Sequence, residues 1–426
     1  MRVRAAFLLG AAVAAMAALA AAQPAGYPQQ LPQPLPLFPA DNWWNVDLRQ
    51  APVDPQSDSF LRSIGLDRSM HPDFGGDAGG TSIYGMPYAV VPGTTPLVPV
   101  AFVLYGDESD AGAPGRPPGY PIPDEAKNAP RWVEGGAPAN VPPNGDRHLL
   151  VVDRDHRLVF ELYRAHWNAG RGRWEAGSGA VFPLDDNRRR PEGWTSADAA
   201  GLAILPGLVR HDEVFGPDPI RHAFRVTVEE TNGHVYPASH TAGDTSGALP
   251  MGARLRLKSS VDLSGFSPAA RKIFEAMKIY GLIVADNGSD LYVQGTYDPR
   301  WDNDELNPAF GRISARDFEV VKLGWTPGAP PPSLPQRPTN LRAQARAPRR
   351  VELTWTDNAV NETAFDVEMR RGAEPFALAK TAPANATAVA VTGLAPGTRY
   401  VFRLRARNER GASRPSNTSA TTTPRN

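Results

Sequence analysis

Near the C-terminus the chain contains a stretch in which apolar and polar side chains alternate strictly, and this pattern constrains the fold more than any other. Apolar or small residues occupy every second position, and the positions between them are mostly arginine: Tyr400, Phe402, Leu404 and Ala406 alternate with Val401, Arg403, Arg405 and Arg407. Successive side chains of a β-strand point to opposite faces, whereas a helix repeats about every 3.6 residues. The alternation therefore predicts a strand with one buried face and one solvent-facing, arginine-rich face.

The residues around this strand resemble a fibronectin type III module over about residues 335–424. The resemblance rests on Trp355 in the segment VELTW, and on Leu394 and Tyr400 in the segment GLAPGTRY. It implies a small antiparallel sandwich in which Trp355 is a core aromatic residue, while Leu394 and Tyr400 form the corner that leads into the second sheet. In secreted bacterial proteins such a module usually accompanies a separate catalytic or binding domain. The resemblance therefore implies that any reaction belongs upstream.

The start of the chain has the three parts of a secretory signal peptide, which we predict over residues 1–22. Arg2 and Arg4 are basic, residues 5–19 are apolar, and small residues at 18–22 offer a cleavage site. A membrane anchor is the alternative, but the apolar run is rich in alanine and no basic flank follows it. No later segment is long enough to span a membrane. We therefore expect a secreted protein, extracellular or periplasmic, with no membrane span after cleavage.

Two proline-rich segments divide the rest of the chain. The first segment, residues 23–39, is rich in Pro and Gln and is expected to be extended and mobile. The second favours polyproline II conformation and should act as a semi-rigid spacer. The predicted order is a signal peptide (1–22), a lead-in (23–39), a main catalytic or binding domain (40–325), a linker (326–338) and a fibronectin type III domain (339–424).

The sequence of the main domain predicts mainly β-structure with a few helices. Short β-branched or aromatic runs at 88–91, 98–105, 148–152 and 158–163 lie between Gly, Pro, Asp and Asn clusters. One helix is clear, with Ser267 as N-cap, Pro268 at its first position and Gly281 after its end; residues 196–202 offer a second, short one. No repeated βαβ pattern appears. We therefore predict a β-rich α+β class, with an antiparallel sandwich or jelly-roll-like main domain.

Composition excludes several functions. The chain has no Cys, so disulfides, a Cys nucleophile and thiolate metal sites are ruled out. The 45 basic and 45 acidic residues are interspersed, which argues against a nucleic-acid partner. Sequence motifs for α/β-hydrolases, zincins, dinucleotide binding and P-loops are absent.

We expect a monomer with no metal site and no cofactor, although calcium binding at an acidic loop is an open alternative. The arginine-rich tail is either a solvated face or a weak attachment to an anionic polymer or cell surface.

Candidate catalytic residues lie where apolar strands end. Asp107 and Glu108 follow the 98–105 run, where two close carboxylates could act as acid and base; a hydrated turn or a calcium loop is the alternative. His148 begins one strand, with Asp146 two positions earlier on the same face, and His240 follows another run. Asp286 ends the 282–285 strand. If these strand ends share one edge of the sheet, the five side chains converge on one cleft.

Loop aromatic residues suggest a carbohydrate ligand, because sugar C–H faces stack on flat rings. Four tryptophans lie in polar or Gly/Pro-rich sequence surroundings: Trp43, Trp44, Trp194 and Trp301. Tryptophans in loops can instead be buried in the hydrophobic core beneath the loop. Arg210 could hold the carboxylate of an acidic sugar, or it could close an internal ion pair. It belongs to a stretch, residues 193–225, that resembles secreted bacterial proteins without an assigned activity.

The leading hypothesis is a secreted enzyme that acts on a polysaccharide or a cell-surface glycan. A glycoside hydrolase with a carboxylate pair is favoured. A lyase, in which His148 or His240 removes the proton next to a uronic carboxylate, is the less favoured form of the same hypothesis. The competing class is a non-catalytic glycan-binding or adhesion protein. Two titratable groups that face each other in a cleft would favour the enzyme, and a shallow aromatic platform would favour the binder.

Overall fold

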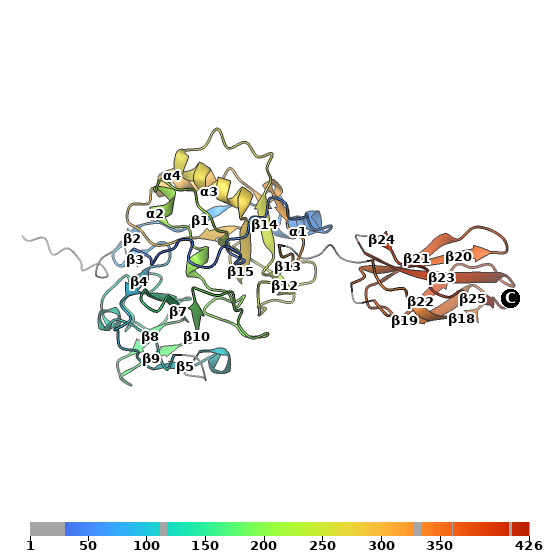
Figure 1. Ribbon diagram of the computed structural model, residues 1–426, viewed down its shortest axis with the longest axis horizontal. Coiled ribbons are helices and arrows are strands. Elements are labelled where there is room, and N and C mark those ends of the chain that lie inside the picture. Colours follow the sequence, from blue (N-terminus) through green and yellow to red (C-terminus); the bar gives the residue numbers. More distant parts are fainter. Residues whose placement is uncertain (1–29, 111–116, 328–333, 360, 409–410, 426) are drawn as a thin grey trace, which may run out of the picture. The chain divides into compact units, whose positions relative to one another are not determined.

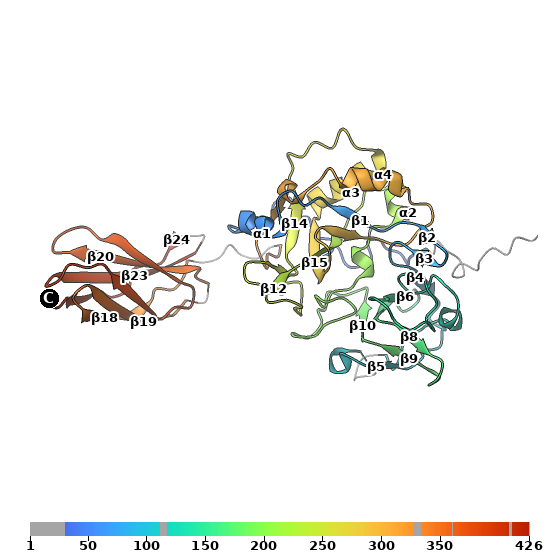
Figure 2. The ribbon, with the colours of Figure 1, turned by 180° about the vertical axis from the view of Figure 1, so that it is seen from behind.

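The computed structural model describes residues 30–110, 117–327, 334–359, 361–408 and 411–425, and it divides into two compact units after Pro327. The predicted signal peptide lies outside the described residues. No helix in the described residues is both long enough and apolar enough to cross a membrane. Each unit has its own hydrophobic core. Figures 1 and 2 show the two units, which are described separately below.

The largest sheet of the main domain has six strands. Their order is β1 (His71–Asp73), β16 (Tyr292–Gln294), β11 (Phe224–Val228), β15 (Leu282–Asn287), β14 (Arg254–Leu257) and β17 (Phe318–Val320). Helix α3 (Pro268–Ile279) begins where predicted, since the hydroxyl of Ser267 accepts a hydrogen bond from the Ala270 N–H (3.3 Å). Its apolar stripe packs into the core that α3 shares with this sheet.

A four-stranded sheet lies between two cores. Its order is β10 (Ser178–Pro183), β7 (Leu158–Tyr163), β6 (Leu149–Asp153) and β4 (Tyr88–Val91). Alternate residues of β6 face opposite sides, so Leu150 and Val152 join the larger core, while Leu149 and Val151 join the smaller one. The smaller core is closed by a third sheet of β5 (Val100–Phe102), β9 (Arg173–Ala176) and β8 (His166–Asn168).

Both views of the main domain show the same layers, from helices α3 and α4 (Asn303–Phe310) through the six-stranded and four-stranded sheets to the β5–β9–β8 sheet (Figures 1 and 2). The smaller elements lie around these layers. They are α1 (Ser57–Ile64), β2 (Asp77–Gly79), β3 (Ser82–Ile83), α2 (His211–Val214), β12 (Thr231–His234) and β13 (Leu249–Met251).

The mainly-β class is confirmed, and three details differ from expectation. The sheets of the main domain mix parallel and antiparallel pairs: β4 runs parallel to β6, and β11 parallel to β15, because long connections return the chain to the same end. Residues 196–202 form no helix, since the Ser196 hydroxyl donates to the carbonyl of Leu202 (2.6 Å) and stabilises a turn. The described part of the lead-in packs on the main domain, where Leu31 and Leu37 are buried.

The C-terminal unit is the predicted sandwich. One sheet contains β18 (Thr339–Ala347), β19 (Arg350–Thr356) and β22 (Ala388–Thr392); the other contains β21 (Ala377–Pro383), β20 (Ala364–Arg371), β23 (Arg399–Asn408), β24 (Gly411–Ala412) and β25 (Ser419–Thr422). Trp355 packs in the core, with its ring centroid 5.4 Å from that of Phe365. The hydroxyl of Tyr400 accepts a hydrogen bond from the Ala395 N–H (2.9 Å), so the predicted corner is present.

Candidate functional site

A pocket of about 210 Å³ lies at the end of β15 in the main domain, and several ionisable side chains meet there. Three of the strand-end carboxylates and histidines singled out in the sequence take part: His240 and Asp286 line the pocket, and Glu108 contacts its wall. The pocket is also lined by Tyr105, Asp146, Tyr163 and Asp198.

Asp286 is held by a buried ion cluster. Arg225 on the neighbouring strand β11 donates from Nη2 to Asp286 Oδ2 (2.9 Å), and binds Asp198 in bidentate fashion at 3.0 and 2.7 Å. The Arg225 and Asp198 side chains are 2% and 0% exposed, so one enclosed cation serves two carboxylates. The side chain of Asp286 is 22% exposed, which leaves it partly open.

This arrangement changes the acidity of Asp286. Burial raises the pKa of Asp286 to about 7; the attraction of Arg225 opposes the rise, and the negative charge of Asp198 reinforces it. Asp146, which lines the same pocket, adds to the rise. Asp286 can therefore carry a proton near neutral pH and release it, as a general acid must.

His240 presents a ring nitrogen to the same region. Its Nδ1 lies 2.8 Å from the carbonyl oxygen of Ala199, an acceptor, so Nδ1 carries the hydrogen. In the neutral ring the lone pair is then on Nε2, which lies 3.9 Å from Oε2 of Glu108. The same carboxylate accepts from the backbone N–H of Thr195 (2.8 Å), which lines the pocket. His240 is thus held by Ala199 with Nε2 facing Glu108, and Glu108 also binds the pocket wall at Thr195.

His148 and Asp107 occupy other positions. The His148 ring is buried with Nδ1 2.8 Å from Oε2 of Glu134 and Nε2 3.0 Å from the Ala197 carbonyl, so both nitrogens donate. Burial opposes this charge, but Glu134 raises the pKa of His148 to about 9. His148 therefore stabilises the pocket wall from behind and has no free nitrogen for proton transfer, and its partner is Glu134 rather than Asp146. Asp107 is exposed in the turn 106–108 and does not line the pocket.

The tryptophans form no stacking platform, which corrects the substrate-binding hypothesis for most of them. Trp43, Trp44 and Trp301 are buried in the main core, and Trp44 is 0% exposed. Their polar sequence surroundings belong to loops that fold over the core, which large rings fill. Trp194 is half-buried and lies under the guanidinium of Arg190, 5.5 Å from its ring centroid. Tyr105 and Tyr163 are the aromatic residues that line the pocket.

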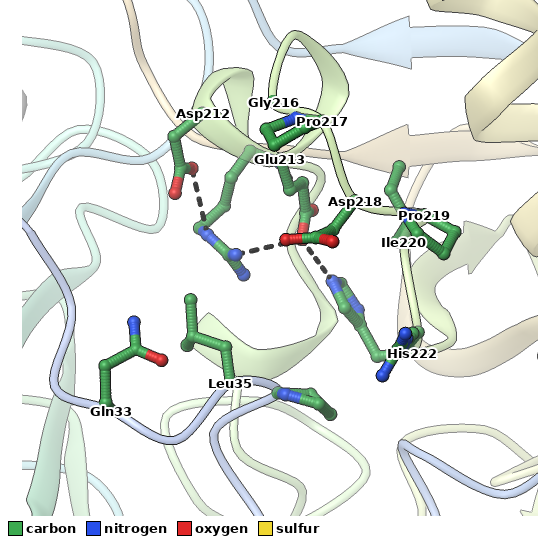
Figure 3. Close-up of a pocket in the computed structure, with 13 residues that line it drawn as sticks. Gln33, Leu35, Asp212, Glu213, Gly216, Pro217, Asp218, Pro219, Ile220 and His222 are labelled. Carbon is green, nitrogen blue, oxygen red and sulfur yellow. Dashed lines mark hydrogen bonds and ion pairs between the residues drawn. The ribbon is translucent and has the colours of Figure 1, made fainter.

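Arg210 belongs to a different pocket, of about 310 Å³, which shares no lining residue with the first (Figure 3). Arg210 donates to Asp212 (3.2 Å) and forms an ion pair with Glu213 (2.9 Å), and Oε2 of Glu213 also lies 2.9 Å from Nε2 of His222. Figure 3 shows the labelled side chains of Asp212, Glu213 and His222 joined by these contacts, with Gln33 and Leu35 also lining the pocket. The internal ion pair, one of the two interpretations of Arg210, is therefore present.

Local sequence patterns do not single out four of the pocket residues. Asp146 stands out in the sequence only as a possible partner of His148, and Tyr105 only as the end of a strand. Asp198 lies in a turn that the sequence did not separate from a helix, and Tyr163 gave no signal beyond strand propensity. No group of His, Asp or Glu that could hold a metal ion occurs in the part of the chain that the structure describes.

The match to a known family lies in the C-terminal unit. Residues 336–422 match the fibronectin type III domain family, which confirms the resemblance of this region. Among solved structures, titin kinase and its flanking domains is 30% identical over 22% of this chain and 18% of that chain, with a TM-score of 0.20. The FN5 domain of Drosophila Lar is 19% identical over 22% of this chain and 100% of that domain, with a TM-score of 0.19. No curated protein matches the chain.

Proposed function

We propose that the protein is a secreted enzyme that hydrolyses glycosidic bonds of a polysaccharide or cell-surface glycan, with Asp286 as the general acid. The observation that carries the proposal is the Asp286 carboxyl group, which is partly open to the pocket and whose pKa burial raises to about 7. A glycosidase acid must hold a proton near neutral pH until it protonates the leaving oxygen.

A second carboxylate is available in the same pocket. Asp146 lines it, and its charge contributes to the raised pKa of Asp286, so the two groups interact. In this proposal Asp146 acts as the base or nucleophile, and His240 with Glu108 assists from the adjacent wall. The pocket is smaller than the roughly 300–1,000 Å³ of most ligand sites, which suits one terminal sugar unit, with Tyr105 and Tyr163 against its ring.

Hydrolysis is better supported than elimination. A lyase needs a cation that neutralises the uronic carboxylate of the substrate while a base removes the neighbouring proton. The cation that binds Asp286 is Arg225, which is 2% exposed and already bound to Asp198 and Asp286. A substrate carboxylate would have to displace one of these buried partners, whereas glycoside hydrolysis uses the carboxyl groups as they stand.

A non-catalytic glycan-binding or adhesion protein is the second candidate. The fibronectin type III match is compatible with it, because this general β-sandwich module is used in binding or adhesion. In this alternative the pocket holds a sugar without cleaving it, and Asp286 contributes a hydrogen bond instead of a proton.

A glycan panel assayed for reducing ends, and for the ultraviolet absorbance of unsaturated products, separates the two candidates. On any cleaved substrate, Asp286→Asn should lower kcat about a hundred-fold or more, because it removes the acid. Asp107→Asn is the matched control, since that exposed side chain lies outside the pocket. Full activity of Asp286→Asn would refute the assignment, and glycan binding without any cleavage would favour the adhesion protein.

A further inference from the structure

The second pocket of the main domain, shown in Figure 3, has walls that are held in place by their own hydrogen bonds. In the loop after α2, the carbonyl oxygens of Glu213 (2.6 Å) and Gly216 (2.8 Å) accept from Nζ of Lys272. In the N-terminal segment that lines the pocket, the carbonyl oxygen of Gln33 accepts from Nη1 of Arg157 (2.6 Å). The volume of about 310 Å³ lies at the lower end of the roughly 300–1,000 Å³ range of ligand sites. The pocket is therefore preformed and large enough for a small ligand.

The ion pairs of this pocket leave one donor and one acceptor without a partner. The Arg210 side chain, 5% exposed, uses Nε for Oδ1 of Asp212 (3.2 Å) and Nη2 for Oε2 of Glu213 (2.9 Å). Among the residues that the structure describes, Nη1 of Arg210 and Oδ2 of Asp212 have no hydrogen-bond partner, and Nη1 is not enclosed by protein atoms. Both side chains line the pocket, so a free donor and a free acceptor are presented by two paired side chains.

The remaining lining combines compensated charge with apolar surface. Oε2 of Glu213 lies 2.9 Å from both Arg210 and His222, so two cationic or donating groups offset its charge. The apolar part of the lining consists of Leu35, Ile220 and the prolines at 36, 217 and 219. An anionic ligand would meet the free carboxylate oxygen of Asp212, and a cationic ligand would meet the Arg210 guanidinium. A neutral ligand that both donates and accepts hydrogen bonds suits both groups.

We propose that this pocket is a second binding site, which holds a neutral sugar ring. A hydroxyl group both donates and accepts, so one hydroxyl of the ring donates to Oδ2 of Asp212 while its neighbour accepts from Nη1 of Arg210. The C–H face of the ring packs on the apolar lining at Leu35 and Ile220. The pocket shares no lining residue with that of Asp286, so the site does not depend on the proposed glycosidase activity.

The test is a sugar titration of the full chain, labelled with nitrogen-15 at histidine and followed by NMR at the ring of His222, which lines the pocket. The probes are glucose and galactose, each compared with its uronate and its amino sugar, which place a charge on the same ring. At least one neutral sugar should move the His222 signals in a saturable way, and should bind more tightly than its two charged forms. Asp212→Ala should weaken this binding about ten-fold or more, because it removes a charged hydrogen-bond acceptor.

Asp47→Ala is the matched control. Asp47, like Asp212, has a side chain that is about half exposed (45% and 51%) and binds an arginine two residues away, but it lies outside the pocket. Asp47→Ala and Asp286→Asn should both keep the wild-type affinity, which separates this site from the proposed glycosidase. Three results would overturn the proposal: neither neutral sugar moves the His222 signals, a charged form binds more tightly, or Asp212→Ala leaves the affinity unchanged.

Discussion

The two units of this protein treat charge in opposite ways. The buried residues of the C-terminal sandwich are mostly apolar, with Glu362 as a buried ionisable residue, and its ion pairs are partly exposed, as that of Arg407, 46% exposed, with Asp366. The main domain encloses charges instead: Arg225 with Asp198, and Arg190 with Asp110, have side chains at most 2% exposed. Desolvation of such pairs is expensive and often outweighs their attraction.

This difference shows where to look for function. In the sandwich most side chains either fill the apolar core or face water, and packing explains their place. In the main domain, several buried charges gather around one pocket, at Arg225, Asp198, His148 and the partly open Asp286. Such an arrangement costs stability that an apolar core would retain, and burial within it raises the pKa of Asp286 to about 7, where acid–base chemistry operates.

The largest expected effect comes from breaking the central buried pair. Arg225→Met leaves Asp198 and Asp286 without their cation, so the free energy of unfolding of the main domain should fall by about 3–5 kcal/mol. Urea denaturation measures this change. Arg407→Ala in the sandwich removes an exposed pair and should cost about 1 kcal/mol or less. Equal losses in the two variants would remove the contrast between the units.

An apolar core responds to lost volume rather than to lost charge. Leu404→Ala removes a fully buried side chain of β23 and should lower the free energy of unfolding of the sandwich by about 2–5 kcal/mol. The urea transition of the main domain should stay where it is. If both transitions shift, the units do not unfold independently and the comparison fails.

The two units should also differ in their response to pH between about 5 and 9. Asp286 and Glu161 have pKa values that burial raises to about 7, above those of unfolded carboxyls, so their contribution to stability is lost as pH rises through about 7. His148, whose pKa Glu134 raises to about 9 against the effect of burial, contributes stability that is fully present below about 6.5 and lost as pH rises through 9. His211, whose pKa burial lowers, acts in the opposite direction.

Calorimetry at pH 5, 7 and 9 measures how the stability of each unit changes with pH. The melting temperature of the main domain should fall across the series, while that of the sandwich, whose charged pairs are on the surface, should change little. His148→Gln should flatten the part between pH 7 and 9. A main-domain transition that rises with pH would contradict the assignment of these buried groups.

The smallest effect is expected from cutting the chain between the units. Proteolysis within residues 326–338 should release a stable C-terminal fragment, and both melting temperatures should stay within error of their values in the intact chain, since few contacts are expected to cross a proline-rich linker. A cut that lowers either transition would show that the units stabilise one another.

The sandwich could be predicted almost completely, because alternation places each side chain on one face and the corner at Tyr400 is a local motif. In the main domain, local signals located strands β4 and β7 and the N-cap of α3. Parallel pairing could not be read, because it depends on where distant strands meet. The same limit hid the cluster of Arg225 with Asp198 and Asp286, since residues 27 and 61 positions apart leave no local pattern. For the same reason, the sequence places the buried tryptophans Trp43, Trp44 and Trp301 in exposed loops, because the core residues that cover them are distant in the chain.

Titration of the Asp286 carboxyl group tests the central claim most directly. Protein labelled with carbon-13 at its aspartate side chains, with the signal assigned by its loss in Asp286→Asn, gives the pKa by NMR. We predict a midpoint of about 7, caused by burial beside Asp198 and opposed by Arg225. A midpoint near the ordinary aspartate value of about 3.9 would show that Asp286 is a permanent anion, and would contradict the acid–base account of the pocket.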